Sequence, residues 1–396
     1  MKLRSVSSVF GFGVTALAVA GFAHQIGCSS SPSSSSAVGQ PPSPPTGPAT
    51  TSTKVETFAI QTLLLGEAPR AGGAATNSAW KSYGYNLDGL VTTETSTNVC
   101  TLAAGAPKIN QIDGNNGIDN SFGSVILPII QSAASLPTPS QTISSYIAKG
   151  NFTIQIQVTG LDDTPTQNAT GLSGQIFASG AYPNGTPTFD MTTDWPVNPQ
   201  LLNDYTNGMC PSGGCLVSSG STITFSQNGT PSAYISNGTF VSGNLATGGI
   251  TVSLSLVFEG VALTLAINHA VITFDHTSPA VAGNGTIAGV IDTNELITGL
   301  QSVAGRISTS LCGSAFTGIA QQIMQASDIL DNGTNMAGTA CTGISIGLGF
   351  TGALVANPDM VSSLDAAVPP DPCATDGGNS NDTGTGNETG NDAAEQ

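Results

Sequence analysis

The sequence of residues 250–274 is ITVSLSLVFEGVALTLAINHAVITF. In its first part, apolar and small polar side chains alternate, so that Val252 and Phe258 lie on the same face of an extended chain. The rest predicts two more strands, over 261–267 and 270–274. Because a period of two is typical of strands that bury one face only, this stretch indicates an antiparallel sheet.

The same alternation recurs along the chain in both directions. It predicts strands over 55–66, 86–101, 152–158, 172–181, 222–226, 233–235, 239–241, 285–290 and 344–350. Asn-Gly pairs, which favour tight hairpins because both residues tolerate positive φ, begin at Asn184, Asn228, Asn237, Asn284 and Asn332. Many short strands with turn signals between them predict a mainly β fold, an antiparallel β-sandwich or jelly-roll-like domain.

A few helices are expected beside the strands. Apolar residues three and four apart over 118–134 predict a helix that breaks or starts again at Pro128. Asp292 and Glu295 have the spacing of a capping box, with Asp292 as the N-cap. The apolar stripes that follow predict a helical pair near 293–328, whose apolar faces belong to the core.

The N-terminal region has the layout of an export signal. Two basic residues come first, and the apolar stretch over 9–22 is too short to span a membrane. Residues 25–28 resemble the bacterial lipobox, in which a small residue precedes a Cys that is acylated and becomes the new N-terminus. We therefore expect a signal peptide over 1–27 and a lipid on Cys28. The alternative is an ordinary secretory signal cut near Ala23, which leaves Cys28 as a thiol.

Both ends of the mature chain are poor in apolar side chains. Residues 28–54 are rich in Ser and Pro and predict a flexible tether, and residues 374–396 predict a disordered acidic tail. The β-rich globular domain is then expected over 55–373. In the lipoproteins that this lipobox resembles, Ser29 in place of Asp implies the outer membrane. The lipid would hold the domain at the bacterial cell envelope, on its periplasmic or extracellular face.

The charge of the chain excludes one class of partner. It has 8 basic and 25 acidic residues, and its formal net charge is −17 at pH 7. Binding to nucleic acid requires clustered Lys and Arg, so no nucleic-acid partner is expected. The polar surface must come mostly from uncharged side chains, which is common on extracellular modules. Residues 68–82 predict a loop, with Trp80 and Tyr83 as isolated aromatic residues.

The cysteines predict disulfide bonds. The chain has seven cysteines, and setting Cys28 aside leaves an even number, which in an exported protein implies a disulfide framework. Fifteen pairings are possible for six cysteines, and the sequence alone leaves them open. Our interpretation pairs Cys210 with Cys215, Cys312 with Cys341, and Cys100 with Cys373.

Oxygen-bearing side chains recur at short intervals over 113–120. Asp113, Asn115 and Asp119, with glycines between them, make a candidate site for Ca²⁺, the one cofactor that the sequence suggests. The spacing differs from that of an EF-hand, and the two carboxylates imply low affinity. The alternative is a Gly/Asn turn that leads into the next helix, with Asp119 or Asn120 as the N-cap.

Paired carboxylates are the one arrangement that suggests an enzyme. Asp190 and Asp194 have an even spacing, which places both on one face of a strand, and the neighbouring Trp195 offers a ring on which a sugar could stack. Glu259 is a further acid from another strand. Carboxylates at strand ends that merely contact solvent explain the same pattern.

Four features of the chain carry a resemblance to a known group of proteins. They are Cys28, Gly-Ile-Asp-Asn-Ser-Phe-Gly over 117–123, Gly-Thr-Ile-Ala-Gly-Val-Ile-Asp-Thr-Asn-Glu over 285–295, and Cys-Thr-Gly-Ile-Ser-Ile-Gly-Leu-Gly-Phe over 341–350. They resemble uncharacterised bacterial lipoproteins of myxobacterial type, and the resemblance covers most of 110–355. It implies a location at the cell envelope and no particular activity.

The shortage of acid and base residues favours a protein without catalysis. We expect a surface-anchored lipoprotein that acts as a binding or structural module. Its lipid would bind the membrane, and a glycan or a protein on the cell surface is the expected further partner. The alternative is a jelly-roll glycan-binding protein or a glycoside hydrolase that uses paired carboxylates.

Overall fold

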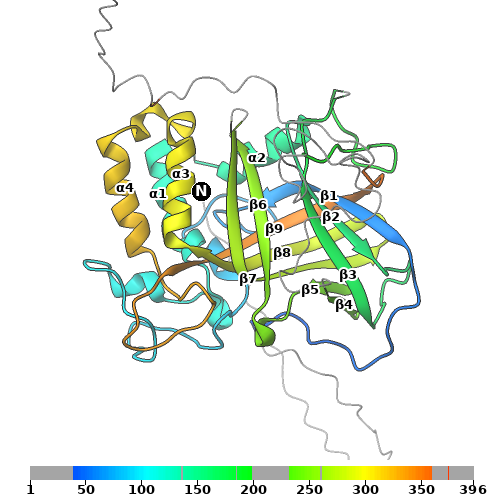
Figure 1. The fold of residues 1–396 in the computed structure, drawn as a ribbon, viewed down its shortest axis with the longest axis horizontal. Coiled ribbons are helices and arrows are strands. Elements are labelled where there is room, and N and C mark those ends of the chain that lie inside the picture. The colour runs from blue at the N-terminus through cyan, green and yellow to red at the C-terminus, as the bar shows by residue number, and fades with distance from the viewer. Residues whose placement is uncertain are drawn as a thin grey trace, which may run out of the picture. The chain divides into compact units, whose positions relative to one another are not determined.

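The structure, a computed structural model, describes residues 39–134, 137–183, 185–198, 232–258, 261–358 and 373 (Figure 1). Its strands are β1 (Val55–Leu64), β2 (Ile154–Thr159), β3 (Ala169–Ala178), β4 (Ala233–Ser236), β5 (Thr239–Ser242), β6 (Ile250–Phe258), β7 (Val261–Ser278), β8 (Val281–Asp292) and β9 (Gly343–Val355). Its α-helices are α1 (Leu127–Ala134), α2 (Pro139–Ala148), α3 (Thr293–Ile307) and α4 (Ser314–Gln325), and a π-helix, η4 (Phe122–Ile126), directly precedes α1. Short 3₁₀ helices are η1 (Ala79–Ser82), η2 (Lys108–Gln111), η3 (Asn115–Gly117), η6 (Leu245–Thr247) and η7 (Thr309–Leu311).

Closure of the sheet defines the architecture. The strand order is β5-β4-β3-β2-β1-β9-β8-β7-β6, and β5 also pairs with β7. Strand β7 pairs with two strands along the same edge: its first half pairs with β6, and its second half pairs with β5. In the pairing with β5, Thr239 lies opposite Asp275. The strands other than β6 therefore close a ring in which every pairing is antiparallel. This mainly β, sandwich-like fold confirms the predicted fold class.

Aromatic side chains from opposite sides of the ring meet in its interior. The ring centroid of Phe58 in β1 lies 5.3 Å from that of Phe274 in β7, and Phe240 in β5 stacks on Phe274 at 4.8 Å. All three side chains are buried, and burial of one such side chain contributes about 2 kcal/mol to stability. The alternation read from the sequence thus builds this core. Outside the ring, α2 packs on β1 and α3 packs on β7.

Strand β7 replaces two predicted strands. The sequence suggested separate strands over 261–267 and 270–274, but the chain stays paired through both. The register with β8 shifts between Asn268 and Val271, and His269 has a φ of 48° at that point. A bulge therefore accommodates the irregularity without ending the strand.

The Asn-Gly pairs play two different roles. Asn237 and Gly238 have φ values of 50° and 82° and form the tight turn between β4 and β5, as predicted. Asn284 instead lies inside β8, where the register with β9 shifts between Ala282 and Gly285. This second pair makes a bulge rather than a hairpin.

The predicted strand over 86–101 is wrong, because this segment forms turns. The side-chain oxygen of Asn86 accepts a hydrogen bond from the backbone N–H of Gly89 at 2.7 Å. Asp88 accepts one from the backbone N–H of Leu90 at 2.8 Å. Such local side-chain hydrogen bonds compete with a strand ladder for the backbone donors.

The predicted helical pair near 293–328 is present as α3 and α4. Asp292 caps α3 as expected, since its Oδ1 accepts hydrogen bonds from the backbone N–H groups of Asn294 and Glu295 at 2.8 and 3.0 Å. The residue also ends β8, so one side chain marks the change from strand to helix.

The predicted helix over 118–134 begins later than expected. It starts as η4 and continues as α1. Asn120 caps it, because its Oδ1 accepts a hydrogen bond from the backbone N–H of Gly123 at 2.9 Å. The wider π-helical turn lies directly before Pro128, which offers no N–H to an α-helical ladder. The interruption predicted at Pro128 is therefore a π-turn.

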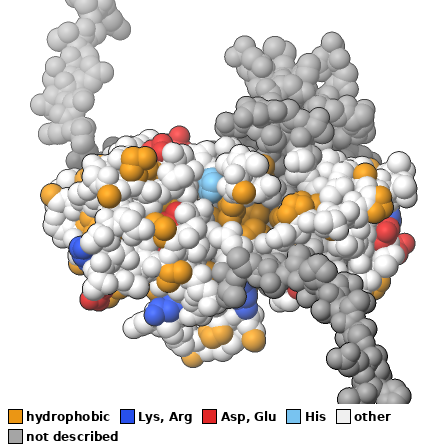
Figure 2. Space-filling view, turned by 90° about the horizontal axis from the view of Figure 1, so that it is seen from below, with side chains coloured by type: hydrophobic (Ala, Val, Ile, Leu, Met, Phe, Trp, Pro, Cys, Tyr) orange, Lys and Arg blue, Asp and Glu red, His pale blue; other side chains and the backbone are white. Residues whose placement is uncertain are grey.

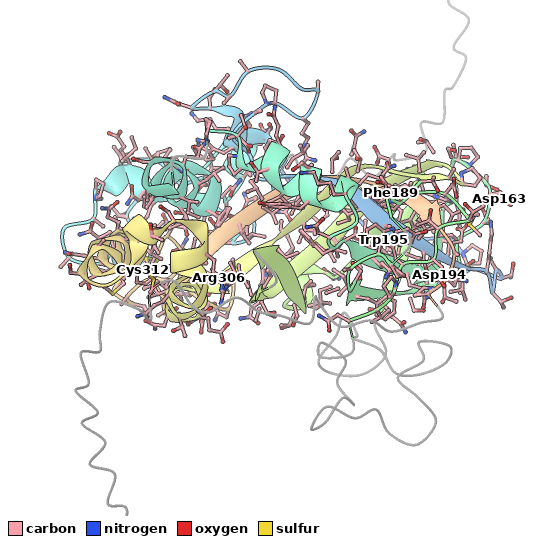
Figure 3. All side chains as sticks on the ribbon, turned by 90° about the horizontal axis from the view of Figure 1, so that it is seen from above. Asp163, Phe189, Asp194, Trp195, Arg306 and Cys312 are labelled. Carbon is pink, nitrogen blue, oxygen red and sulfur yellow. A yellow bond between two sulfur atoms is a disulfide. The ribbon has the colours of Figure 1, made fainter. Side chains whose placement is uncertain are left out.

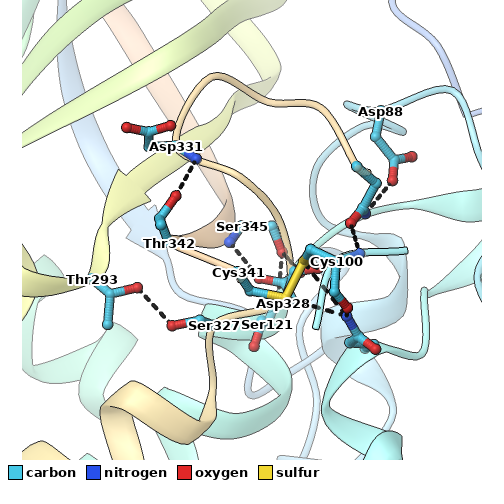
Figure 4. The surroundings of a disulfide bond; sticks show 12 residues. Asp88, Cys100, Ser121, Thr293, Ser327, Asp328, Asp331, Cys341, Thr342 and Ser345 are labelled. Atoms are coloured by element: carbon cyan, nitrogen blue, oxygen red, sulfur yellow. Dashed lines mark hydrogen bonds between the residues drawn. A yellow bond between two sulfur atoms is a disulfide. The ribbon is translucent and has the colours of Figure 1, made fainter. Parts of the chain in front are cut away.

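The disulfide pairing differs from our interpretation. Cys100 is bonded to Cys341, and Cys312 to Cys373, so the predicted pairs Cys312–Cys341 and Cys100–Cys373 are both wrong (Figure 4). The reason is a long-range backbone contact: Thr101 pairs with the chain just before β9, and the N–H of Thr101 donates to Thr339. This contact brings Cys100 beside Cys341, which no local spacing reveals.

Part of the predicted tether lies against the domain. Residues 48–54 run beside β3 and the loop after β2: the backbone N–H of Thr50 donates to Thr170 at 2.7 Å, and the hydroxyl of Ser52 donates to Leu161. Before them, Gly39 and Gln40 both bond to the backbone of Asn86. The prediction of a flexible tether is wrong for this part, because its extended backbone pairs with a strand.

Several predictions concern residues outside those described. These are the signal peptide over 1–27, Cys28 with the start of the tether, Asn184, Asn228, the strand over 222–226, Cys210, Cys215, Glu259 and the tail over 374–396. In the part of the chain that the structure describes, no helix has both the length and the apolar character that a membrane span requires.

Candidate functional site

Trp195 does not form the predicted sugar contact. Its side chain is 0% exposed, and its ring centroid lies 5.3 Å from that of Tyr182 and 5.6 Å from that of Phe189. Figure 3 shows Trp195 and Phe189 at the end of the fold that also carries Asp194. A ring buried in this way has no free face for a sugar.

The acids Asp190 and Asp194 have different surroundings. Asp190 is exposed and accepts hydrogen bonds from the hydroxyl and the backbone N–H of Thr192, which lower the pKa of its carboxyl. Asp194 is half-buried, and Glu259 lies outside the described residues. The arrangement of Asp190 is that of a carboxylate that stabilises a surface turn.

Two of the three predicted calcium ligands lie close together. Asp113 accepts a hydrogen bond from the backbone N–H of Thr92 at 2.5 Å, and Asp119 accepts one from Leu87 at 2.6 Å. The two carboxyl groups interact electrostatically, whereas Asn115 is exposed on η3. No group of three His, Cys, Asp or Glu side chains among the described residues has a metal-binding arrangement. The calcium site stays a prediction.

The carboxyls of this cluster hold protons more firmly than usual. Burial raises the pKa of Asp113 to about 7, and the carboxylates of Asp88 and Asp119 lie nearby. Burial and the neighbouring acids Asp88, Asp113 and Asp328 raise the pKa of Asp119 well above its ordinary value. Burial also raises the pKa of Asp328 to about 7, although Ser345 donates two hydrogen bonds to it. This cluster can store protons near neutral pH.

A buried ionisable pair inside the ring was not predicted. Glu56 in β1 and His276 in β7 are 2% and 1% exposed, and their side chains lie 4.0 Å apart. Lys54 connects Glu56 to Asp163, at 2.8 and 2.6 Å. One oxygen of Glu56 therefore pairs with Lys54, and the other lies 4.0 Å from the His276 ring nitrogen.

A pocket of about 440 Å³ opens where the end of β1, the loop after it and the segment η4–α1 meet. A volume of this size is typical of small-molecule sites. The described residues that line it are Gly66, Glu67, Ala75, Thr76, Asn77, Trp80, Gly123, Ser124, Leu127, Pro128 and Gln131. The wall therefore combines one large aromatic side chain with hydroxyl and amide groups.

Two glycines allow the segments of this pocket to approach each other. A Cβ at Gly123 would lie 2.8 Å from the Cβ of Trp80 and 2.8 Å from the amide nitrogen of Asn120. Gly66 has a φ of 104°, and a Cβ there would lie 3.4 Å from the Cα of Trp80. A larger residue at Gly123 would push the Trp80 segment away from η4, and a larger residue at Gly66 would strain its left-handed backbone.

Trp80 is held in place by its own loop. Its indole N–H donates a hydrogen bond to the backbone oxygen of Asn77 at 3.0 Å, and the ammonium of Lys81 lies 5.7 Å from the ring centroid. The side chain remains partly exposed. The sequence showed only an isolated aromatic residue in a polar loop, and this was the one available signal for the pocket.

Glu67 lines the pocket, but its carboxylate is already engaged. One oxygen accepts a hydrogen bond from the backbone N–H of Ser140 at 2.7 Å, and the other accepts one from the Ser140 hydroxyl at 2.6 Å. Ser140 lies in the first turn of α2, where backbone donors attract a negative charge. Glu67 therefore anchors the start of α2 and is 7% exposed.

Comparisons with family models, with curated proteins and with solved structures found no match for this chain. The function must therefore be argued from the pocket itself.

Proposed function

We propose that this chain is a surface-anchored binding module whose ligand site is the pocket around Trp80. The observation that carries the proposal is the combination, in one cavity of about 440 Å³, of a fixed aromatic side chain with uncharged polar groups. Sites for small molecules have this composition, in which apolar surface supplies affinity and a few polar groups supply orientation.

Binding accounts for this pocket better than hydrolysis does. Hydrolysis by paired carboxylates needs an acid and a base or nucleophile on opposite sides of the bond that is cleaved. Among the described lining residues, Glu67 is the one acid, and Ser140 occupies both of its oxygens. The pocket therefore supports the non-catalytic reading of the chain.

The anchor in this proposal is a lipid on Cys28, and its support is the signal-like segment and the lipobox at 25–28. A lipid there would hold the domain at the bacterial outer membrane, where a glycan or a protein on the cell surface is the partner. Mass spectrometry of the mature N-terminus tests this part. A chain that begins at residue 28 and carries acyl mass supports it, and an unacylated chain that begins at another residue contradicts it.

A thermal-shift screen tests the site. Sugars, amino acids, nucleosides and organic acids are screened against the native protein, against Thr76→Trp, which fills the pocket from an exposed lining position, and against Thr95→Trp, which makes the same change at an exposed residue outside the lining. A true ligand raises the melting temperature of the native protein and of Thr95→Trp, but not that of Thr76→Trp. The proposal fails if no compound shows this difference.

A further inference from the structure

We infer that the ligand is an uncharged carbohydrate, one sugar ring of which lies against the indole of Trp80. This inference rests on the proposed binding function and adds the chemical class of the ligand. It depends on three properties of the pocket: a fixed aromatic ring, a set of side chains that both donate and accept hydrogen bonds, and a lining with little available charge.

The aromatic ring is positioned before any ligand arrives. The hydrogen bond from the indole to Asn77 and the close approach of Gly123 hold the side chain of Trp80 at the pocket wall. A sugar ring has an apolar face of C–H groups and a polar rim, and a flat indole matches that face. Because the ring is already fixed, binding loses little side-chain entropy.

The polar side chains of the wall match the rim of a sugar. A sugar hydroxyl both donates and accepts a hydrogen bond, and so do the hydroxyl of Thr76 and the amide of Asn77. Neither of these side chains forms a hydrogen bond with another described residue, and both are exposed. Gln131 donates to Pro137 at 3.0 Å, which leaves its amide oxygen as an acceptor.

Charge disfavours anionic ligands. The described lining has no Lys or Arg, and each oxygen of its one acid, Glu67, accepts a hydrogen bond from Ser140. Lys81 lies over the indole without lining the pocket. The whole chain carries a net charge of −17, which repels phosphates and carboxylates. Figure 2 shows one face of the molecule, on which charged side chains are few.

The two tryptophans of the chain give a direct readout. Trp195 is buried in the core, so a change in tryptophan fluorescence caused by a ligand at the pocket comes from Trp80. The probes are glucose, N-acetylglucosamine, cellobiose and chitobiose as neutral sugars, with glucuronate, uridine monophosphate and diglycine as ionic compounds of similar size. We expect a saturable fluorescence change with at least one neutral sugar and none with the ionic probes.

Variants assign the signal to the pocket. Trp80→Ala should raise the dissociation constant for that sugar by about tenfold, measured by calorimetry, and Trp80→Phe, which keeps an aromatic face, should raise it less. Asn77→Ala keeps the backbone oxygen that accepts from the indole, so it tests the amide alone and should also weaken binding. Thr95→Ala is the control and should bind as the native protein does. Melting curves identify any variant that fails to fold.

The outcomes separate this inference from the proposed function. If amino acids, nucleosides or organic acids bind at the pocket and neutral sugars do not, the carbohydrate assignment is overturned and the binding function stands. If neutral sugars bind but Trp80→Ala, Trp80→Phe and Asn77→Ala all bind them unchanged, the assignment to this pocket is overturned. If no compound of any class binds, both proposals fall.

Discussion

The ring of strands and the loop region, residues 66–119, are stabilised by different forces. In the ring, aromatic side chains such as Phe274 pack against residues of distant strands in a buried apolar core. In the loop region, buried carboxyls such as Asp119 accept backbone hydrogen bonds, and the disulfide between Cys100 and Cys341 ties the loop to the chain before β9 (Figure 4). The ring depends on the burial of apolar side chains. The loop region depends on hydrogen bonds to buried polar groups and on a disulfide bond.

This difference explains where the pocket lies. Gly66 and Trp80 belong to the loop region, whereas Gly123 belongs to the helical segment that packs beside β9. Asn120 joins these parts, because its amide bonds to Tyr83 in the loop region and to Gly347 in β9. A rigid sheet can thus present a site built by loops, which vary without loss of the core.

The largest expected effect is in the ring. Phe274→Ala should lower the free energy of unfolding by about 4 kcal/mol, because it opens a cavity between Phe58 and Phe240. Urea unfolding measures the change. The control is Val91→Ala in the loop region, where the side chain is 65% exposed and the change should stay within about 0.5 kcal/mol. Equal losses of stability in the two variants would contradict the conclusion that the ring depends more on apolar burial than the loop region does.

The ring was largely predictable, because its signals are local. The alternation over 152–158 gives β2, and Asn237-Gly238 gives the turn between β4 and β5. Asp292 marks the start of α3 for an equally local reason, since a cap needs only the first turn of its own helix. The closure of the ring was not predictable, because the pairing of β5 with β7 joins strands whose register no turn determines.

The loop region was mostly unpredictable, because its contacts are long-range. The partner of Cys100 lies 241 residues away in the sequence. Glycines that mark the pocket look like ordinary loop glycines until Gly123 is placed against Trp80. The two tryptophans were also misjudged: Trp195 lies next to acids in the sequence yet is buried, and Trp80 was noted only as an isolated aromatic residue.

The second effect concerns the covalent bond of the loop region. The double variant Cys100→Ser/Cys341→Ser should lower the free energy of unfolding by about 3 kcal/mol, because the unfolded chain gains the freedom that the bond removes. The pair Cys312 and Cys373 is the matched control. Its residues are 61 apart in sequence rather than 241, so its removal should cost about 1 kcal/mol less.

Hydrogen exchange then shows which residues lose protection in the double variant. Without the bond between Cys100 and Cys341, amides of 86–101 should exchange faster, whereas amides of β1 should keep their protection, because the ring core is intact. If β1 and the loop region lose protection together, the two regions form one cooperative unit and the comparison drawn above is wrong.

The third effect is the pH dependence of two carboxyls, Asp113 in the loop region and Asp328, which lies between α4 and β9. Burial raises the pKa of Asp113 and of Asp328 from 3.8 to about 7, so the folded chain holds protons that the unfolded chain has released above about pH 4. The stability that these protons give is complete below the unfolded pKa and is lost as the pH rises through about 7. Between about pH 5 and about pH 8 the free energy of unfolding should therefore fall as the pH rises.

Asn substitutions isolate the source of this fall. Asp113→Asn keeps an oxygen that accepts from Thr92 but cannot ionise, so it should raise the melting temperature near pH 8 and flatten the pH profile. Asp190→Asn makes the same chemical change at an exposed carboxyl and should leave the profile as it is. Addition of Ca²⁺ near pH 8 would flatten the native profile too if the cluster holds this ion. A native profile that rises from pH 5 to pH 8 would mean that these carboxyls are stabilised in their charged form. The loop region would then owe its stability to ionic contacts rather than to buried carboxyls that keep their protons.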